Sequence, residues 1–285
     1  MFRTYVQHWK PRQESVHLIA GGAFAAGLEV ARNSFYLHNE DVATAEAKGL
    51  QKLMEAYGTF ESPFETAKTL DRMMGAFEFF LTAYPLGADG FEPATFPDGR
   101  RGIEFSFAEP LEIAHPLTND PILYAGRCDM MGTFADGFFV EDDKTTTSLG
   151  ASWSRQWEMR SQFTGYCWAA KRAGFNPQGA LIRGVSILKT KFDTQQVVSY
   201  RADWELERWE DQLYRDVNRM LDAWRKDTWD YNLDNACGEY GGCSLLSICK
   251  SKDPEPWLAS SMEQRVWDPL GRKELSVEEW EASWI

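Results

Sequence analysis

A predicted β-hairpin between residues 122 and 143 constrains the fold of this chain more than any other feature. Residues 122–133 and 137–143 have the composition of strands, and Ala135-Asp136-Gly137 forms a short turn between them. The second strand begins with the apolar run Phe138-Phe139-Val140 and ends in Asp142-Asp143-Lys144. A strand that enters a core and ends in charged residues is typical of α/β proteins, whose ligand sites lie at the carboxyl ends of strands.

The segments around this hairpin alternate between helical and extended patterns. Helices are predicted at 16–36, 41–57 and 63–84, the last opened by the capping box Ser62-Pro63-Phe64-Glu65. Residues 85–101 read as a loop, and 102–107 as a further strand. Beyond the hairpin the pattern predicts a helix at 155–172, strands at 178–191 and 195–200, and a long amphipathic helix at 203–225.

Length and composition favour one elaborated domain over two small ones. The chain has 285 residues, of which 44% are hydrophobic, enough to bury a large core. Its parts are a helical amino-terminal region (1–84), an α/β core (102–200), a helix followed by cysteines (203–250) and a tail (251–285). No secretion signal or membrane span is recognised, so a cytoplasmic protein that does not enter membranes is expected.

The formal charge of −13 argues against a nucleic-acid partner, since phosphate binding draws on lysine and arginine. The charge is unevenly distributed, however. Nine basic residues stand against six acids between Arg127 and Lys191. A locally basic face on an acidic body is compatible with transient DNA binding.

Asp129, Asp142 and Lys144 form the candidate catalytic group. Magnesium and manganese prefer oxygen ligands, often one or two carboxylates with several waters. Residues two apart on a strand share a face, so Asp142 and Lys144 point together while Asp143 points away. A cation and a lysine then meet at one phosphate, where the lysine can position water or offset negative charge. On its own, an Asp-Asp-Lys run is most often a solvated turn or strand end.

Gln162 and Tyr166 are four residues apart and share one face of the predicted helix. Such a pair is often a coincidence at the edge of a core. Beside the acids, it could clamp a substrate backbone or orient the lysine and water.

In this order and spacing, the residues resemble the RecB-type branch of the PD-(D/E)XK nucleases. The matching pieces are residues 126–129 (Gly-x-x-Asp), 142–144 (Asp-x-Lys) and 162–166 (Gln-x-x-x-Tyr). The resemblance is to phage exonucleases and to CRISPR-associated exonucleases that carry an iron-sulfur cluster. It implies a restriction-endonuclease-like three-layer α/β core with a mixed central sheet and helical terminal segments.

The family also has a helix reading Gly-x-x-x-His-x-x-x-Glu, whose histidine is a metal ligand. The matching stretch is 21–29, with Ala25 in place of the histidine. Glu29 then remains as an acid near the metal site. Glu104, on the strand before Asp129, is a candidate for the missing ligand, and it is equally well read as an exposed strand residue.

Cys237, Cys243 and Cys249 are evenly spaced near the end of the chain and are candidate ligands of an iron-sulfur cluster or Zn²⁺. In the family, three late cysteines and an early one hold a [4Fe-4S] cluster. This chain has no early cysteine, so a shortened start and a lost cluster are both open. Cys128 and Cys167 read as buried thiols.

The resemblance implies a Mg²⁺- or Mn²⁺-dependent DNA exonuclease acting on linear ends in phage or host recombination, repair or defence. A homo-oligomer or a recombination partner protein is compatible with it. Ala25 and the acidic surface motivate a second hypothesis, a DNA-end-binding or partner-docking module with degraded catalysis. A third is a structural role in which zinc at the late cysteines stabilises the fold.

Overall fold

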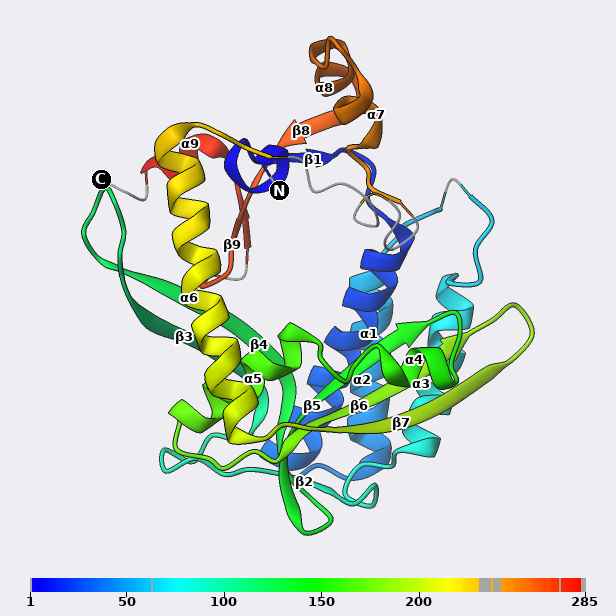
Figure 1. The fold of residues 1–285 in the computed structure, drawn as a ribbon. Coiled ribbons are helices and arrows are strands. Elements are labelled where there is room, and N and C mark those ends of the chain that lie inside the picture. The colour runs from blue at the N-terminus through cyan, green and yellow to red at the C-terminus, as the bar shows by residue number, and fades with distance from the viewer. Residues whose placement is uncertain (1, 63, 231–236, 238–241, 272, 283–285) are drawn as a thin grey trace. The chain divides into compact units, whose positions relative to one another are not determined.

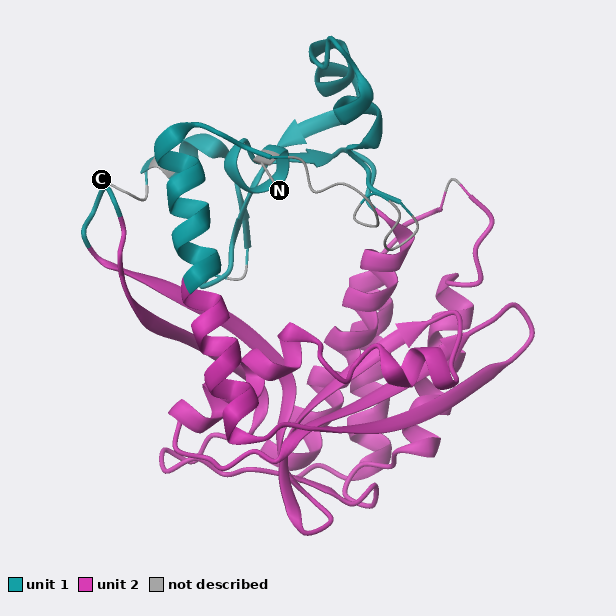
Figure 2. Cartoon of the chain, in the orientation of Figure 1, with its two compact units in different colours: residues 1–14, 116–119, 215–285 teal, residues 15–115, 120–214 magenta. Residues whose placement is uncertain are grey.

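The computed structural model describes residues 2–62, 64–230, 237, 242–271 and 273–282. The chain divides into two compact units (Figures 1 and 2). One comprises residues 15–115 and 120–214, and the other comprises 1–14, 116–119 and 215–285. Every residue proposed for the acidic site lies in the first of these units, and the three late cysteines lie in the second.

A six-stranded mixed sheet forms the centre of the larger unit. The strands run in the order β2-β4-β5-β6-β7, and β3 also pairs with β4. Strands β5 and β6 are parallel, whereas the other pairs are antiparallel. Their bounds are β2 (Phe91–Pro93), β3 (Ile103–Ala114), β4 (Pro121–Phe134), β5 (Gly137–Thr146), β6 (Gly179–Ile187) and β7 (Phe192–Tyr200).

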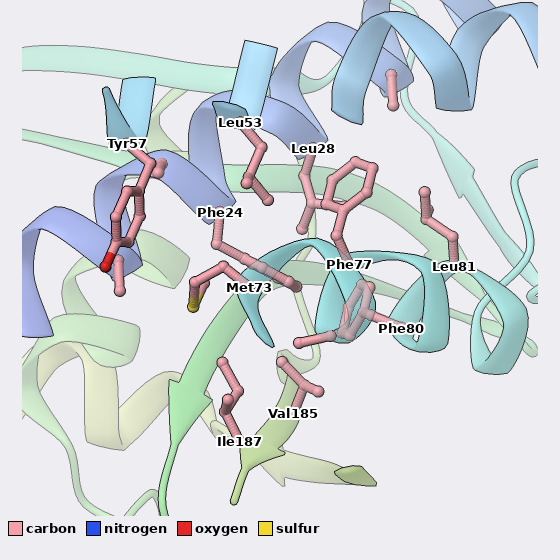
Figure 3. Close-up of a cluster of buried hydrophobic side chains, with 14 of the residues drawn as sticks. Phe24, Leu28, Leu53, Tyr57, Met73, Phe77, Phe80, Leu81, Val185 and Ile187 are labelled. Atoms are coloured by element: carbon pink, nitrogen blue, oxygen red, sulfur yellow. The ribbon is translucent and has the colours of Figure 1, made fainter. Parts of the chain in front are cut away.

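Helices cover both faces of this sheet, giving three layers, as predicted for the fold class. On one side, α1 (Val16–Arg32), α2 (Val42–Tyr57) and α3 (Leu70–Ala83) pack around side chains of β6 (Figure 3). Helix α5 (Ser161–Arg172) contacts β4, β5 and β6 from the other side. Short α4 (Ala151–Arg155) precedes α5, and α6 (Asp203–Lys226) follows β7.

The core under α1 to α3 is aromatic and closely packed. Phe24 makes edge-to-face contacts with Phe77 and Phe80, at ring-centroid distances of 5.8 and 5.4 Å. Helices α1 and α2 approach closely because Gly27 and Gly49 lack side chains, since a Cβ at Gly27 would lie 2.9 Å from the Gly49 carbonyl oxygen. This packing fixes α1 against the sheet.

The predicted elements agree with the structure in type and mostly in position. The hairpin is confirmed: Phe134 pairs with Gly137, so two residues form the turn between β4 and β5. The predicted helix at 16–36 is α1 followed by a π-helical turn, η2 (Asn33–Leu37). The predicted loop at 85–101 also contains the short strand β2.

Two helix predictions were wrong in extent. The helix expected from residue 63 begins at Leu70, where the Thr69 hydroxyl accepts the Arg72 N–H at 3.4 Å. The Ser62 hydroxyl instead accepts the Phe64 N–H at 3.3 Å, which closes a local turn rather than capping a helix. The helix expected at 155–172 begins at Ser161, because residues 156–159 form a turn after α4.

The smaller unit consists of short elements. Strand β1 (Trp9–Pro11) pairs with β8 (Met262–Gln264), and β9 (Val266–Asp268) pairs with β10 (Lys273–Leu275), both antiparallel. Its helical elements are η1 (Phe2–Val6), α7 (Leu246–Lys250), α8 (Glu255–Ser261) and α9 (Val277–Ala282). The segment predicted as a tail therefore carries regular structure. No helix among the described residues has the length and apolarity that a membrane span requires.

Candidate active site

The candidate site lies where β4 and β5 separate. The ladder between these strands ends at the pair Met130 and Glu141, so Asp129 and Asp142 are the first residues beyond it. Beyond the ladder, Asp129 Oδ2 accepts a hydrogen bond from the backbone N–H of Asp143 at 2.7 Å. The fork brings two carboxylates from neighbouring strands to one place.

Lys144 and Gln162 both contact Asp142. The Lys144 ammonium forms an ion pair with Asp142 Oδ2. From α5, Gln162 Nε2 lies 3.4 Å from Asp142 Oδ1 and donates to the Tyr166 hydroxyl at 2.9 Å. The structure thus assembles Asp142, Lys144, Gln162 and Tyr166 into one connected group, with Asp129 linked to it through the backbone of residue 143.

The group around Asp142 is buried, and it holds two carboxylates and one lysine. Burial, with the neighbouring Asp142 and Asp143 charges, raises the pKa of Asp129 well above its ordinary value. Burial also raises the pKa of Asp142, although Lys144 opposes that shift. For Lys144, burial favours the neutral form, but Asp142 and Asp129 outweigh it and raise the pKa. The lysine is therefore cationic at neutral pH, and the carboxylates still lack compensating positive charge.

Glu104 lies on β3 opposite Asp129, between the pairs Ile103–Met130 and Phe105–Cys128. Its backbone has a φ of 51°, in the left-handed region that a non-glycine residue seldom adopts within a strand. Its carboxylate forms an ion pair with Arg127, whose Nε lies 2.8 Å from Glu104 Oε2. Burial raises the pKa of Glu104 to about 7, even though Arg127 lowers it. The reading of Glu104 as an exposed strand residue is wrong, because its side chain is 10% exposed.

Glu29 is near this group without a described contact to Asp129 or Asp142. It lies on α1, half-buried, and its charge contributes to the raised pKa of Glu104. Ala25, one turn earlier, is also half-buried and provides no ligand atom. Helix α1 therefore brings one carboxylate, that of Glu29, close to Glu104.

Gly126 lies opposite Phe107 in the ladder between β3 and β4. A Cβ at Gly126 would lie 2.5 Å from the Phe107 ring, so glycine is required for the packing of β3 on β4. Cys128 and Cys167 are fully buried thiols, as predicted.

A buried ion network on the other side of β5 was missed by the sequence reasoning. Arg32 Nη1 lies 2.6 Å from Asp143 Oδ2, and its Nη2 lies 3.4 Å from Glu141 Oε1. Arg183 pairs with Asp89 and approaches Glu141 Oε1 at 3.8 Å. The available signal was Arg32 itself, one of two charges in an otherwise uncharged helix.

An open surface hollow borders Gln162. It is lined by residues 155–156 and 158–162, from the turn between α4 and α5. Arg155 and Arg160 contribute positive charge to this wall against one acid, Glu158, and Met159 is 85% exposed. The hollow gives the group around Asp142 a basic, accessible neighbour.

The late cysteines lie in the smaller unit. Cys237 is partly buried, whereas Cys243 and Cys249 are exposed, and the Cys243 N–H donates to the Cys237 carbonyl at 3.0 Å. Within the described residues, no group of three or more His, Cys, Asp or Glu side chains is already arranged to hold a metal ion. A cluster at the cysteines stays a prediction.

Comparison with known proteins adds little to this geometry. No protein-family model matches the chain, and no curated protein matches it. Among solved structures, the chain aligns with the crystal structure of SSO0001 at 13% identity and a TM-score of 0.28, over 65% of this chain and 72% of that one.

Proposed function

We propose that this protein is a Mg²⁺- or Mn²⁺-dependent nuclease that hydrolyses phosphodiester bonds in DNA. The observation that carries the proposal is the group at the fork of β4 and β5, where Asp129 and Asp142 meet Lys144, Gln162 and Tyr166. Acids that are buried, crowded and short of positive charge need a cation to be ionised together.

The residues present suit a hard divalent cation. Asp129 and Asp142 offer carboxylate oxygens from adjacent strands, and Glu104 stands opposite Asp129. Mg²⁺ commonly uses one or two carboxylates and keeps waters in its other positions. When bound, such a cation neutralises charge on phosphoryl oxygens and lowers the pKa of water.

The remaining side chains then have separate tasks. Lys144, cationic and 30% exposed, offsets negative charge that develops on the phosphoryl group. Gln162 and Tyr166 orient the Asp142 carboxylate and contact the substrate backbone from α5. Arg155 and Arg160, beside Gln162, attract the phosphates of the approaching strand.

The finer assignment to an exonuclease follows from the family resemblance alone. On that basis the substrate is a linear DNA end, and the setting is phage or host recombination, repair or defence. A homo-oligomer or a recombination protein is the partner proposed with it.

The test is cleavage of end-labelled linear DNA and of a closed circular form of the same sequence in Mn²⁺. Wild-type protein is expected to degrade the linear form only, and Asp142→Ala is expected to be inert. Cleavage of both forms would indicate an endonuclease. Equal inertness of wild-type and variant protein, with binding retained, would favour the alternative of a DNA-end-binding or docking module, which the alanine at position 25 motivates.

We further propose a metal centre at Cys237, Cys243 and Cys249. Thiolates bind iron-sulfur clusters and Zn²⁺. Metal analysis with a visible absorption spectrum of protein purified without oxygen distinguishes the two. Protein that contains neither iron nor zinc would overturn this assignment.

A further inference from the structure

Arg201 is a buried arginine directly after β7 that the proposed chemistry does not use. The residue is 6% exposed. Its guanidinium donates four described hydrogen bonds, at 2.7 to 2.9 Å, to the Trp157 and Tyr200 carbonyls and the Ser199 and Thr164 hydroxyls. All four acceptors are neutral groups. Burial of a charge against neutral groups is unfavourable, and it lowers the pKa of Arg201. An arginine buried in this way is a candidate for a role other than stability.

Arg201 contacts the chain at both ends of the segment 157–164, which leads from the turn after α4 into the first turn of α5. Nη2 donates to the Trp157 carbonyl at 2.9 Å, and Nε donates to the Thr164 hydroxyl at 2.9 Å. The Ser199 hydroxyl, which accepts from Arg201 Nη1, also donates to the Trp157 carbonyl, at 3.1 Å. Because the guanidinium is planar and rigid, it fixes the turn relative to α5.

The same two groups hold Arg160, the residue at which α5 begins. The Thr164 hydroxyl donates to the Arg160 carbonyl at 3.3 Å, and the Arg160 N–H donates to the Trp157 carbonyl at 3.3 Å. Arg160 makes no described capping bond with its own side chain. The start of α5 therefore depends on the Trp157 carbonyl and the Thr164 hydroxyl, both of which Arg201 bonds.

The segment 157–164 carries part of the candidate active site. Gln162 reaches Asp142 Oδ1 at 3.4 Å, and residues 158–162 line the open hollow beside it. Both features face the acids and Lys144 from α5. Arg201 thus influences the candidate site through this segment and lies behind it.

The ring of Trp157 extends the connection to the lysine of the site. Its centroid lies 5.5 Å from that of Phe163, in an edge-to-face contact. Lys144 Nζ lies 5.9 Å from the Phe163 centroid. A shift of the turn would therefore be felt by the packing around Lys144 as well as by Gln162.

We propose that Arg201 is a positioning residue, which holds the segment 157–164 so that Gln162 meets Asp142 and Arg160 faces the bound strand. This role rests on the proposed function of the fork between β4 and β5, because Arg201 acts on the same substrate through Gln162 and Arg160. A residue that only stabilises the fold would have effects independent of these two side chains. A positioning residue shares its effect with them, so the combined variants lose less than the product of the single losses.

The first test is a double-mutant cycle on cleavage of linear DNA in Mn²⁺. Arg201→Lys keeps the charge and lacks the planar fork that reaches Trp157 and Thr164 together. Arg201→Lys and Gln162→Ala are each expected to slow single-turnover cleavage by about tenfold, because each removes the Gln162 bond to Asp142. The double variant is expected to remain about tenfold slower than wild type, where independent effects would give about a hundredfold.

The second test is a cycle on DNA binding, which needs no turnover. Binding of fluorescent linear DNA is measured by anisotropy in EDTA. Arg160→Met is expected to weaken binding because it removes a positive charge that faces the phosphates. In the Arg201→Lys background the same change is expected to cause no further loss of affinity, because Arg160 is no longer held toward the strand.

Arg72→Lys is the matched control. Arg72, on α3, also donates to two backbone carbonyls, those of Leu188 and Lys191 in the turn between β6 and β7. This variant is expected to cleave and bind DNA as the wild type does, even if its urea midpoint falls. Should Arg201→Lys fail to fold, Thr164→Val removes the hydroxyl that Arg201 bonds and replaces it in both cycles.

A wild-type rate and affinity in Arg201→Lys would overturn the proposal, as would fully multiplicative losses in either cycle or an equal slowing in Arg72→Lys. Wild-type protein that binds DNA and is inert in Mn²⁺ would defeat the nuclease assignment alone, and a shared loss in the binding cycle would still support the role of Arg201. Wild-type protein that neither cleaves nor binds DNA would overturn both.

Discussion

The two sides of β5 use the same residue types to different ends. Toward α1, Glu141 and Asp143 meet Arg32, and Arg183 approaches Glu141 from β6. Toward α5, Asp142 meets one lysine, and Asp129 adds a second carboxylate at the end of the ladder. The first side sets two arginines among three acids, since Arg183 also pairs with Asp89, and the second sets one lysine among two acids. Each side is therefore one positive charge short. What distinguishes them is access: the side chains of Arg32 and Arg183 are at most 5% exposed, whereas that of Lys144 is 30% exposed.

The largest expected effect comes from the enclosed side of β5, toward α1. Arg32→Met should leave Glu141 and Asp143 buried with too little positive charge, so the free energy of unfolding should fall by about 3–5 kcal/mol. Urea unfolding followed by circular dichroism measures this change. Arg32→Lys, which keeps a charge, should lose less. A urea midpoint equal to that of the wild type in Arg32→Met would show that Arg32 does not stabilise the carboxyl-terminal end of β5.

On the other side, removing the single cation should cost activity, with some loss of stability because buried Asp142 loses its ion-pair partner. Lys144→Met is expected to lower the rate of DNA cleavage in Mn²⁺ by about 10²–10³-fold, because charge on the phosphoryl group loses its partner. Single-turnover assays measure the rate at a temperature where circular dichroism shows that the variant is folded. A variant that cleaves at the wild-type rate would remove Lys144 from the mechanism.

A smaller loss is expected from the α5 contact to the same acid. Gln162→Ala should slow cleavage by about tenfold, since it removes one neutral hydrogen bond to Asp142, worth roughly 1 kcal/mol. Gln51→Ala offers a control, because Gln51 is exposed on α2 and bonds Glu55 there. Equal rates for the two variants would mean that Gln162 has no special role.

The smallest expected effect concerns the pH dependence of stability. The pKa of Glu104 is about 7 in the folded protein against 4.5 ordinarily, so the folded state holds this proton more tightly. The free energy of unfolding should therefore fall as pH rises from 4.5 to about 7, and the Tm should fall with it. Glu104→Gln should flatten this part of the profile. A Tm that rises over the same range in metal-free protein would contradict the sign.

Sequence reasoning identified the strand and helix positions of the acidic group because local patterns determine them. The hairpin turn, the alternation that turns Asp143 away from Asp142, and the helical spacing of Gln162 and Tyr166 are all short-range features. The start of α3 was misplaced because Ser62 and Thr69 offer competing local hydrogen bonds.

The ion network behind the site could not be predicted in the same way. Arg32 and Glu141 are far apart in sequence, and only the packing of α1 on the sheet brings them within 3.4 Å. Lys68 likewise meets Thr145 through a loop whose course no local pattern specifies. Long-range charge pairing is a property of the tertiary fold, so the difference between the two sides of β5 became visible only in three dimensions.

The end of the ladder at Met130 and Glu141 has a mechanical consequence. Beyond that pair, the spacing of Asp129 and Asp142 depends on a single side-chain hydrogen bond to the backbone of Asp143 instead of a rigid run of strand pairs. Past the fork, β4 stays paired with β3 and β5 with β6, so spreading would move these two pairs of strands against each other. Movement of this kind would let the fork between β4 and β5 accommodate ions of different radius. Tolerance of both magnesium and manganese would then be a property of the backbone rather than of any one side chain.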